Sequence, residues 1–168
     1  MGKRSRLRSI LRMRRSLLYA ATCVAIVAGG CSSGDDGTPV ACRAPASDYA
    51  DALGAAPGSV TLDGGTPISD CLVADQSPAE LGEVGESVIE AATQLNAAAR
   101  SDQDGDSALA LGYLVGALQQ GASETGGIHT DLLRRLDAAA RFAPAGEPPD
   151  ATFERDFGQG YAAGQQDG

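Results

Sequence analysis

The apolar residues in the second half of the chain recur every three or four positions, which is the period of an α-helix that buries one face. The clearest stretch runs over residues 77–100, with its apolar positions at Leu81, Val84, Val88, Ala92, Leu95 and Ala99. It opens with Ser77-Pro78-Ala79-Glu80, the pattern of a capping box with proline at the first helical position. The pattern therefore predicts a long helix from residue 77 to about residue 100.

A second helix is expected over residues 106–120, because its apolar residues fall on one face. These are Leu111, Leu114, Val115 and Leu118. Gly121 follows directly, and glycine is a common C-terminal stop. A third helix is expected over residues 128–142, with Thr125 or Thr130 as its cap and Pro144 as its stop.

A fourth, weaker helix is expected over residues 150–163. Its apolar stripe consists of Phe153, Phe157 and Tyr161. Glycines in the same stretch each lower helix stability by up to about 1 kcal/mol. The order of these elements predicts a mainly α fold, a small bundle of about four helices in two helical hairpins.

Residues 42–76 show no sustained helical period and are expected to form an irregular segment before the helical domain of residues 77–168. The piece SDYADALG fits one short helix, capped by Ser47 and ended by Gly54. Further on, Asp63-Gly64-Gly65 separates two short extended pieces, because Asp-Gly is a strong turn signal.

The first 30 residues have the composition of an export signal. Seven basic residues and no acidic ones precede residue 31, and the apolar run of residues 17–28 is about twelve residues long. A membrane-spanning helix needs about 20 residues, whereas the core of a signal peptide needs about 7–15. We therefore predict a cleaved signal peptide over residues 1–30, with an uncleaved signal-anchor as the alternative. The basic start places the chain beyond this leader outside the cytoplasm.

The end of this leader resembles the lipobox of bacterial lipoproteins. Ala28-Gly29-Gly30-Cys31 offers small residues before a cysteine, although that family usually has Leu where this chain has Ala28. The resemblance implies a diacylglycerol thioether on Cys31, cleavage just before it and a flexible tether over residues 31–41. It also implies a lipid anchor on the extracytoplasmic face of the cell membrane. Arg14-Arg15 leaves open whether export is general secretory or twin-arginine.

Removal of the leader makes the chain strongly acidic. Residues 31–168 keep six basic residues against all 22 acidic ones, a net charge of about −16 compared with −9 for the whole chain. A surface of this charge repels nucleic acid. We therefore expect no nucleic-acid partner.

The cysteines agree with export. Cys23 leaves with the leader and Cys31 takes the lipid, so Cys42 and Cys71 remain as an even pair. Paired cysteines in an oxidising compartment form disulfides. A Cys42–Cys71 disulfide is predicted, with two free buried thiols as the alternative.

Two motifs suggest binding. Asp102, Asp104 and Asp106 alternate as in the start of a calcium loop, but the glycine and glutamate that an EF-hand needs further on are absent. A solvated loop that caps the next helix is the preferred interpretation. Gly112 and Gly116 flank Tyr113 at a spacing that lets two helix backbones approach closely, and the same spacing could instead form a ligand groove.

The Gly112 motif has a second copy. GYLVGALQQG begins at Gly112 and GYAAGQQDG begins at Gly160, so the chain repeats Gly-Tyr-x-x-Gly 48 residues apart. Two copies in a chain rich in Ala and Gly are too few to define a repeat family.

The remaining chemistry-bearing residues have modest interpretations. His129 is the single histidine and lies near Asp131. No nucleophile motif accompanies it, which favours a structural or surface role over that of a base. Arg134, Arg135 and Arg141 are expected either to pair with acids of a neighbouring helix or to dock an anionic partner.

Together these features predict a lipid-anchored cell-envelope protein whose helical domain is a non-catalytic interaction module for an envelope protein partner. The alternative is a small-molecule or cation-binding lipoprotein. Gly112, Tyr113, Gly116 and His129 are the candidate ligand or partner surface. No catalytic constellation is visible, so neither enzymatic activity nor a cofactor is expected.

Overall fold

The computed structural model describes residues 37–101, 105–141 and 149–168. The leader, Cys31, Asp102 and Asp104 lie outside these ranges. The chain divides into two units, Met1–Ser33 and Gly34–Gly168, and the second contains every element described below.

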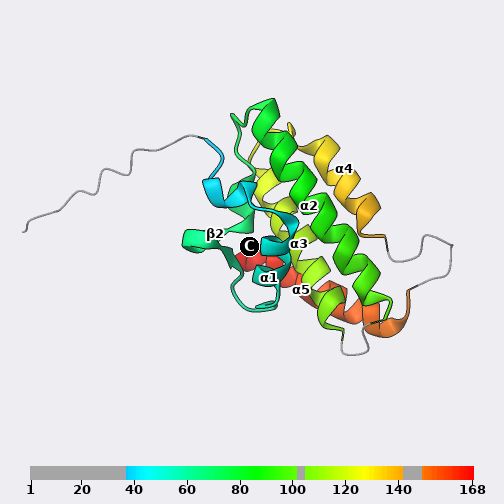
Figure 1. The fold of residues 1–168 in the computed structure, drawn as a ribbon. Coiled ribbons are helices and arrows are strands. Elements are labelled where there is room, and N and C mark those ends of the chain that lie inside the picture. The colour runs from blue at the N-terminus through cyan, green and yellow to red at the C-terminus, as the bar shows by residue number, and fades with distance from the viewer. Residues whose placement is uncertain (1–36, 102–104, 142–148) are drawn as a thin grey trace, which may run out of the picture. The chain divides into compact units, whose positions relative to one another are not determined.

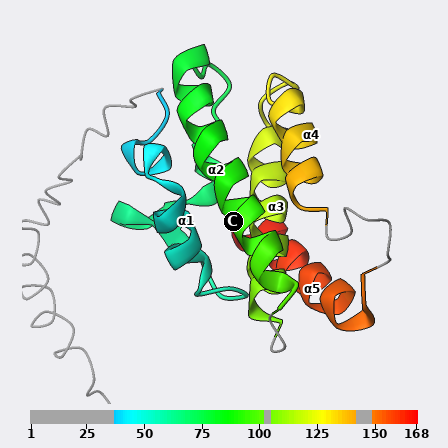
Figure 2. The same cartoon turned by 45° about the vertical axis from the view of Figure 1, so that its right-hand side comes forward.

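The described ranges are mainly helical (Figures 1 and 2). Five α-helices lie within them: α1 Ala46–Leu53, α2 Pro78–Ala99, α3 Asp106–Ser123, α4 Thr130–Ala139 and α5 Ala151–Asp167. The chain before α2 also forms two short strands, β1 Thr61–Leu62 and β2 Thr66–Pro67, which the 3-10 helix η2 Asp63–Gly65 connects. Two further 3-10 helices, η1 Val40–Arg43 and η3 Ile68–Cys71, precede α1 and follow β2. The predicted small helical bundle is confirmed.

α2 begins and ends where its sequence signals place it. The Ser77 hydroxyl accepts a hydrogen bond from the Glu80 N–H at 3.3 Å, and the Glu80 carboxylate accepts one from the Ser77 N–H at 3.2 Å. This reciprocal capping box satisfies two N–H groups that a helix start leaves unpaired. Arg100 is the C-cap, as expected.

α3 is the central helix of the bundle. Every residue from Ala110 to Leu118 is buried, and the helix contacts α1, α2, α4, α5 and η3. It runs to Ser123, so the expected stop at Gly121 is wrong. Gly121 serves close packing instead, because a Cβ there would lie 3.1 Å from the Ser69 Cα and overlap the Ser69 carbonyl oxygen.

α4 is shorter than the pattern predicts. It begins after a turn over residues 124–129, and His129 occupies its N-cap position. In the described structure neither Thr125 nor Thr130 caps it; their hydroxyls donate to the carbonyls of Ala122 and Gly127. The expected end at Phe142 and Pro144 lies outside the described residues. The helix ends at Ala139.

A side chain of another helix caps the end of α4. The side-chain amide of Asn96, on α2, donates to the backbone oxygens of Ala139 and Arg141, both at 2.7 Å. These are carbonyls that a helix end leaves without partners in its own chain segment. The two helices run side by side in Figure 1.

α5 is longer than expected and packs along α3. The Asp150 carboxylate accepts from the Phe153 N–H at 2.8 Å and caps its start. Of the two expected hairpins, α2–α3 is present, whereas α5 lies on α3 rather than along α4.

The segment before α2 is irregular, as predicted, and a disulfide closes it into a loop. Cys42 and Cys71 form this bond, and both are fully buried. β1 and β2 pair antiparallel across the Asp63-Gly64-Gly65 turn, where both glycines have positive φ. α1 ends at the predicted Gly54, but Pro45 rather than Ser47 occupies its N-cap position.

Candidate functional site

The contact between α3 and α5 is built from four glycines, two on each helix. A Cβ on Gly112 would lie 2.9 Å from the Tyr161 nitrogen, and one on Gly116 would lie 3.1 Å from the Gln165 nitrogen. On α5, a Cβ on Gly160 would lie 3.0 Å from the Tyr113 nitrogen, and one on Gly164 would lie 2.9 Å from the Ala117 nitrogen. Only hydrogen fits at these four positions. The two Gly-Tyr-x-x-Gly copies therefore pack against each other.

This packing corrects the candidate surface. Gly112, Tyr113 and Gly116 are buried under α5, so they form neither a ligand groove nor an exposed partner face. The Tyr113 hydroxyl accepts a hydrogen bond from the Val60 N–H at 3.2 Å. Burial raises the pKa of Tyr113, which keeps the phenol neutral.

His129 is also buried, with no exposed surface, and belongs to a chain of polar side chains. Its Nε2 lies 2.8 Å from the Gln76 side-chain oxygen, and its Nδ1 lies 2.7 Å from the Thr125 hydroxyl. The Gln76 amide in turn donates to the Thr38 hydroxyl at 2.8 Å and to the Cys71 carbonyl at 3.0 Å. These bonds link the entry of the domain to the turn before α4. His129 therefore has the structural role that its isolation in the sequence favours.

Electrostatics agree with that role. Burial lowers the pKa of His129, because the charged imidazolium loses its hydration. Asp131 does not pair with it; its carboxylate accepts from Arg134, one turn along α4. Arg134 thus pairs within its own helix rather than with a neighbouring one.

The aspartate motif gains no metal geometry in the described ranges. Asp106 is the exposed first residue of α3, next to Gly105 with a φ of 82°. Within those ranges no three His, Cys, Asp or Glu side chains lie together as a metal site would require.

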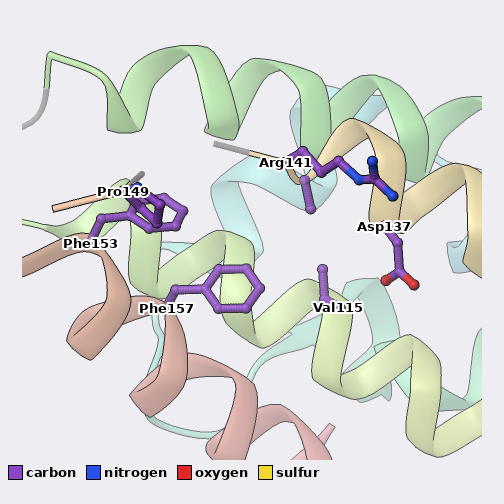
Figure 3. A pocket seen from close by; sticks show the side chains of 7 residues that line it. Val115, Asp137, Arg141, Pro149, Phe153 and Phe157 are labelled. Carbon is purple, nitrogen blue, oxygen red and sulfur yellow. The ribbon is translucent and has the colours of Figure 1, made fainter. Parts of the chain in front are cut away.

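An open pocket of about 440 Å³ lies between α3, α4 and α5 (Figure 3). Most of its lining is apolar and consists of Val115, Ala140, Pro149, Phe153 and Phe157. Two charged residues, Asp137 and Arg141, complete the lining. The Phe153 and Phe157 rings are stacked, with centroids 5.7 Å apart. Figure 3 shows Arg141 and Asp137 together at the end of the pocket away from Phe153.

The pocket presents both apolar and charged side chains to an occupant. Asp137 and Arg141 are exposed and, among the described residues, form no ion pair. They can meet charged groups of an occupant, while the phenyl rings cover its apolar part.

Sequence reasoning assigned Phe153 and Phe157 to a helix stripe and missed the pocket. A usable signal was the Asp137/Arg141 pair, four residues apart at the end of a helix and followed by the aromatic stripe. A second hollow of about 250 Å³ lies between α1, α2 and α3 and is lined mainly by small side chains.

Comparison of the chain with protein-family models, with curated proteins and with solved structures finds no match. None of the helices in the described ranges has the length and apolar content to cross a membrane.

Proposed function

We propose that this is a lipid-anchored protein of the bacterial cell envelope, held on the extracytoplasmic face of the membrane, whose helical domain acts by binding rather than by catalysis. The basic leader, the short apolar run and the lipobox-like Ala28-Gly29-Gly30-Cys31 support the anchor. Two or more acyl chains on Cys31 would hold the protein stably, since a single chain binds only marginally.

The structural observation that carries the proposed location is the buried Cys42–Cys71 disulfide. Disulfides form and persist in oxidising compartments and are rare in the cytosol. A structural disulfide inside the core therefore fits a chain that folds after export.

The anchor is tested by intact-protein mass spectrometry and membrane fractionation of the protein produced in a bacterial host. We expect the mass of residues 31–168 plus a lipid, in the membrane fraction. A Cys31→Ser variant should lose the lipid, while the matched Cys23→Ser variant, altered within the leader, should behave as wild type. An intact leader on the wild-type chain, or a bare thiol at Cys31, would refute the anchor.

The proposed partner is another envelope protein that contacts an exposed helical face. Arg135 on α4 is exposed and, among the described residues, forms no ion pair, so it suits an acidic partner segment. Crosslinking from position 135 in intact cells, compared with crosslinking from Gln94 on α2, tests this. Capture of one defined protein from position 135 alone supports it, and equal capture from both positions contradicts it.

A second candidate function is small-molecule binding, favoured by the pocket between α3, α4 and α5. Its volume of about 440 Å³ falls in the usual range for ligand sites, about 300–1,000 Å³. The cation-binding version depends on Asp102, Asp104 and Asp106, and a thermal melt with and without calcium tests it, because a bound ligand raises apparent stability.

A further inference from the structure

We infer that the pocket between α3, α4 and α5 binds a free α-amino acid with a large apolar side chain. The inference rests on the small-molecule-binding function proposed above and names its ligand class. Two features of the lining carry it: an apolar surface with two aromatic rings, and an acid and a base next to each other at one end.

The apolar part of the pocket suits a side chain of similar character. Phe153 is nine-tenths buried and supports Phe157, whose ring is partly exposed toward the pocket. Val115 forms the base on α3. Aromatic rings favour offset or edge contacts with another ring, so an aromatic ligand body fits best.

The charged end suits a group with both charges. Asp137 lies in the last turn of α4 and Arg141 lies two residues beyond the helix end, and they make no ion pair with each other. An α-amino acid presents an ammonium to Asp137 and a carboxylate to Arg141. The Arg guanidinium can meet that carboxylate through two parallel N–H donors.

The net charge of the protein bears on the choice between an amino acid and ligands of the same shape that carry a single charge. The chain after residue 30 carries about −16, which opposes an anion of the same shape at long range. An amino acid has no net charge and is not repelled, while both of its charges find partners. The net charge attracts a plain cation at long range, but in the pocket this cation would meet the repulsion of Arg141 as well as the attraction of Asp137, and it would leave Arg141 without a partner.

Four probes separate the contributions. L-phenylalanine carries an aromatic side chain and both charged groups. 2-Phenylethylamine lacks the carboxylate, 3-phenylpropanoate lacks the ammonium, and glycine lacks the side chain. Binding is measured by saturation-transfer NMR on the whole protein in lipid nanodiscs, with empty nanodiscs as blank. We expect phenylalanine to bind with a Kd of about 1 mM and each other probe at least about threefold more weakly.

Substitutions of the residues that line the pocket test whether the ligand binds there. Phe157→Ala should weaken phenylalanine about tenfold or more, because it removes the ring that covers the ligand body. Asp137→Asn and Arg141→Gln should each weaken it about two- to fivefold, as expected for exposed charge contacts. Arg135→Gln, on the same helix but outside the lining, is the matched control and should change nothing. Arg141 is exposed, so its variant is informative even if Phe157→Ala fails to fold.

The outcome of the ligand-binding test is independent of the outcome of the lipid-anchor test. If Cys31 proves to carry no lipid, the same measurement is made on the whole protein in solution, so loss of the anchor proposal leaves this test intact. No saturable binding of phenylalanine up to about 10 mM, stronger binding of either singly charged probe, or a response to Arg135→Gln equal to that of Arg141→Gln would overturn the inference. Binding that no pocket variant weakens would overturn it as well.

Discussion

The glycine contact between α3 and α5 predicts that one substitution has opposite effects at two positions of the same helix. Gly158 and Gly160 are two residues apart on α5. A Cβ at Gly158 meets nothing within 4 Å, whereas a Cβ at Gly160 would lie 2.8 Å from the Leu109 carbonyl carbon and would overlap its oxygen. Alanine is favoured over glycine inside a helix by about 1 kcal/mol. Gly158→Ala should therefore raise the free energy of unfolding by about 1 kcal/mol.

At Gly160 the same gain in helix propensity is opposed by the steric clash of the added Cβ with the Leu109 backbone. Ordinary contact begins near 3.4 Å, and because the added Cβ would overlap the Leu109 carbonyl oxygen, the two backbones must separate by about 1 Å or more there. A gap of 0.5–1 Å loses about a quarter to a half of each dispersion contact across the interface. Overpacking of this kind costs about 3 kcal/mol, and more when backbone must move. Gly160→Ala should therefore lower the free energy of unfolding by about 2 kcal/mol after the gain in helix propensity.

Urea unfolding followed by circular dichroism, with the disulfide intact, measures both variants. For a slope of about 2 kcal/mol per molar urea, the midpoint should rise by about 0.5 M for Gly158→Ala and fall by about 1 M for Gly160→Ala. Equal shifts at the two positions would refute the close approach of α5 to α3. So would a stabilised Gly160→Ala variant.

Three further predictions use the same assay. Asn96→Ala should lower the free energy of unfolding by about 1–2 kcal/mol, because the part-buried bonds to the Ala139 and Arg141 carbonyls are lost; Gln94→Ala, exposed on the same helix, should change it by less than about 0.5 kcal/mol. Burial lowers the pKa of His129 below its ordinary 6.5, so the unfolded chain takes up the proton first. Stability should therefore be full above pH 6.5 and fall as the pH drops below it until the folded imidazole also protonates; a His129→Gln variant with the same slope between pH 7 and 5 would contradict this. The double variant Cys42→Ala, Cys71→Ala should lose about 3–4 kcal/mol, the loop-closure value for a sequence separation of 29, and an unchanged midpoint would argue against it.

Local signals in the sequence predicted where the helices lie better than they predicted the residues at which the helices end. α2 is predictable because the Ser77–Glu80 box and its apolar period lie within the helix itself. Gly121 looks like a stop when only its own helix is considered, but its partner, Ser69, lies 52 residues earlier. The end of α4 is likewise capped by Asn96 of another helix.

The candidate site depends still more on the tertiary arrangement. The two Gly-Tyr-x-x-Gly copies are visible in the sequence, but nothing local says that they pack against each other. That contact places Phe153 and Phe157 beside the end of α4 and so creates the pocket. Composition and spacing therefore predicted the helices and the disulfide, but not the pocket that the helices form.

The disulfide also determines how the domain responds to mechanical load. A pull on the chain upstream of Thr38 reaches Cys42 within four residues and passes through the sulfur bridge to Cys71, close to the start of α2. Residues 43–70 lie outside that path and cannot be drawn out while the bridge holds. Tension thus passes directly to α2, the longest helix of the described ranges, and while the bridge holds stretching can extend the residues before Cys42 and after Cys71 but not residues 43–70.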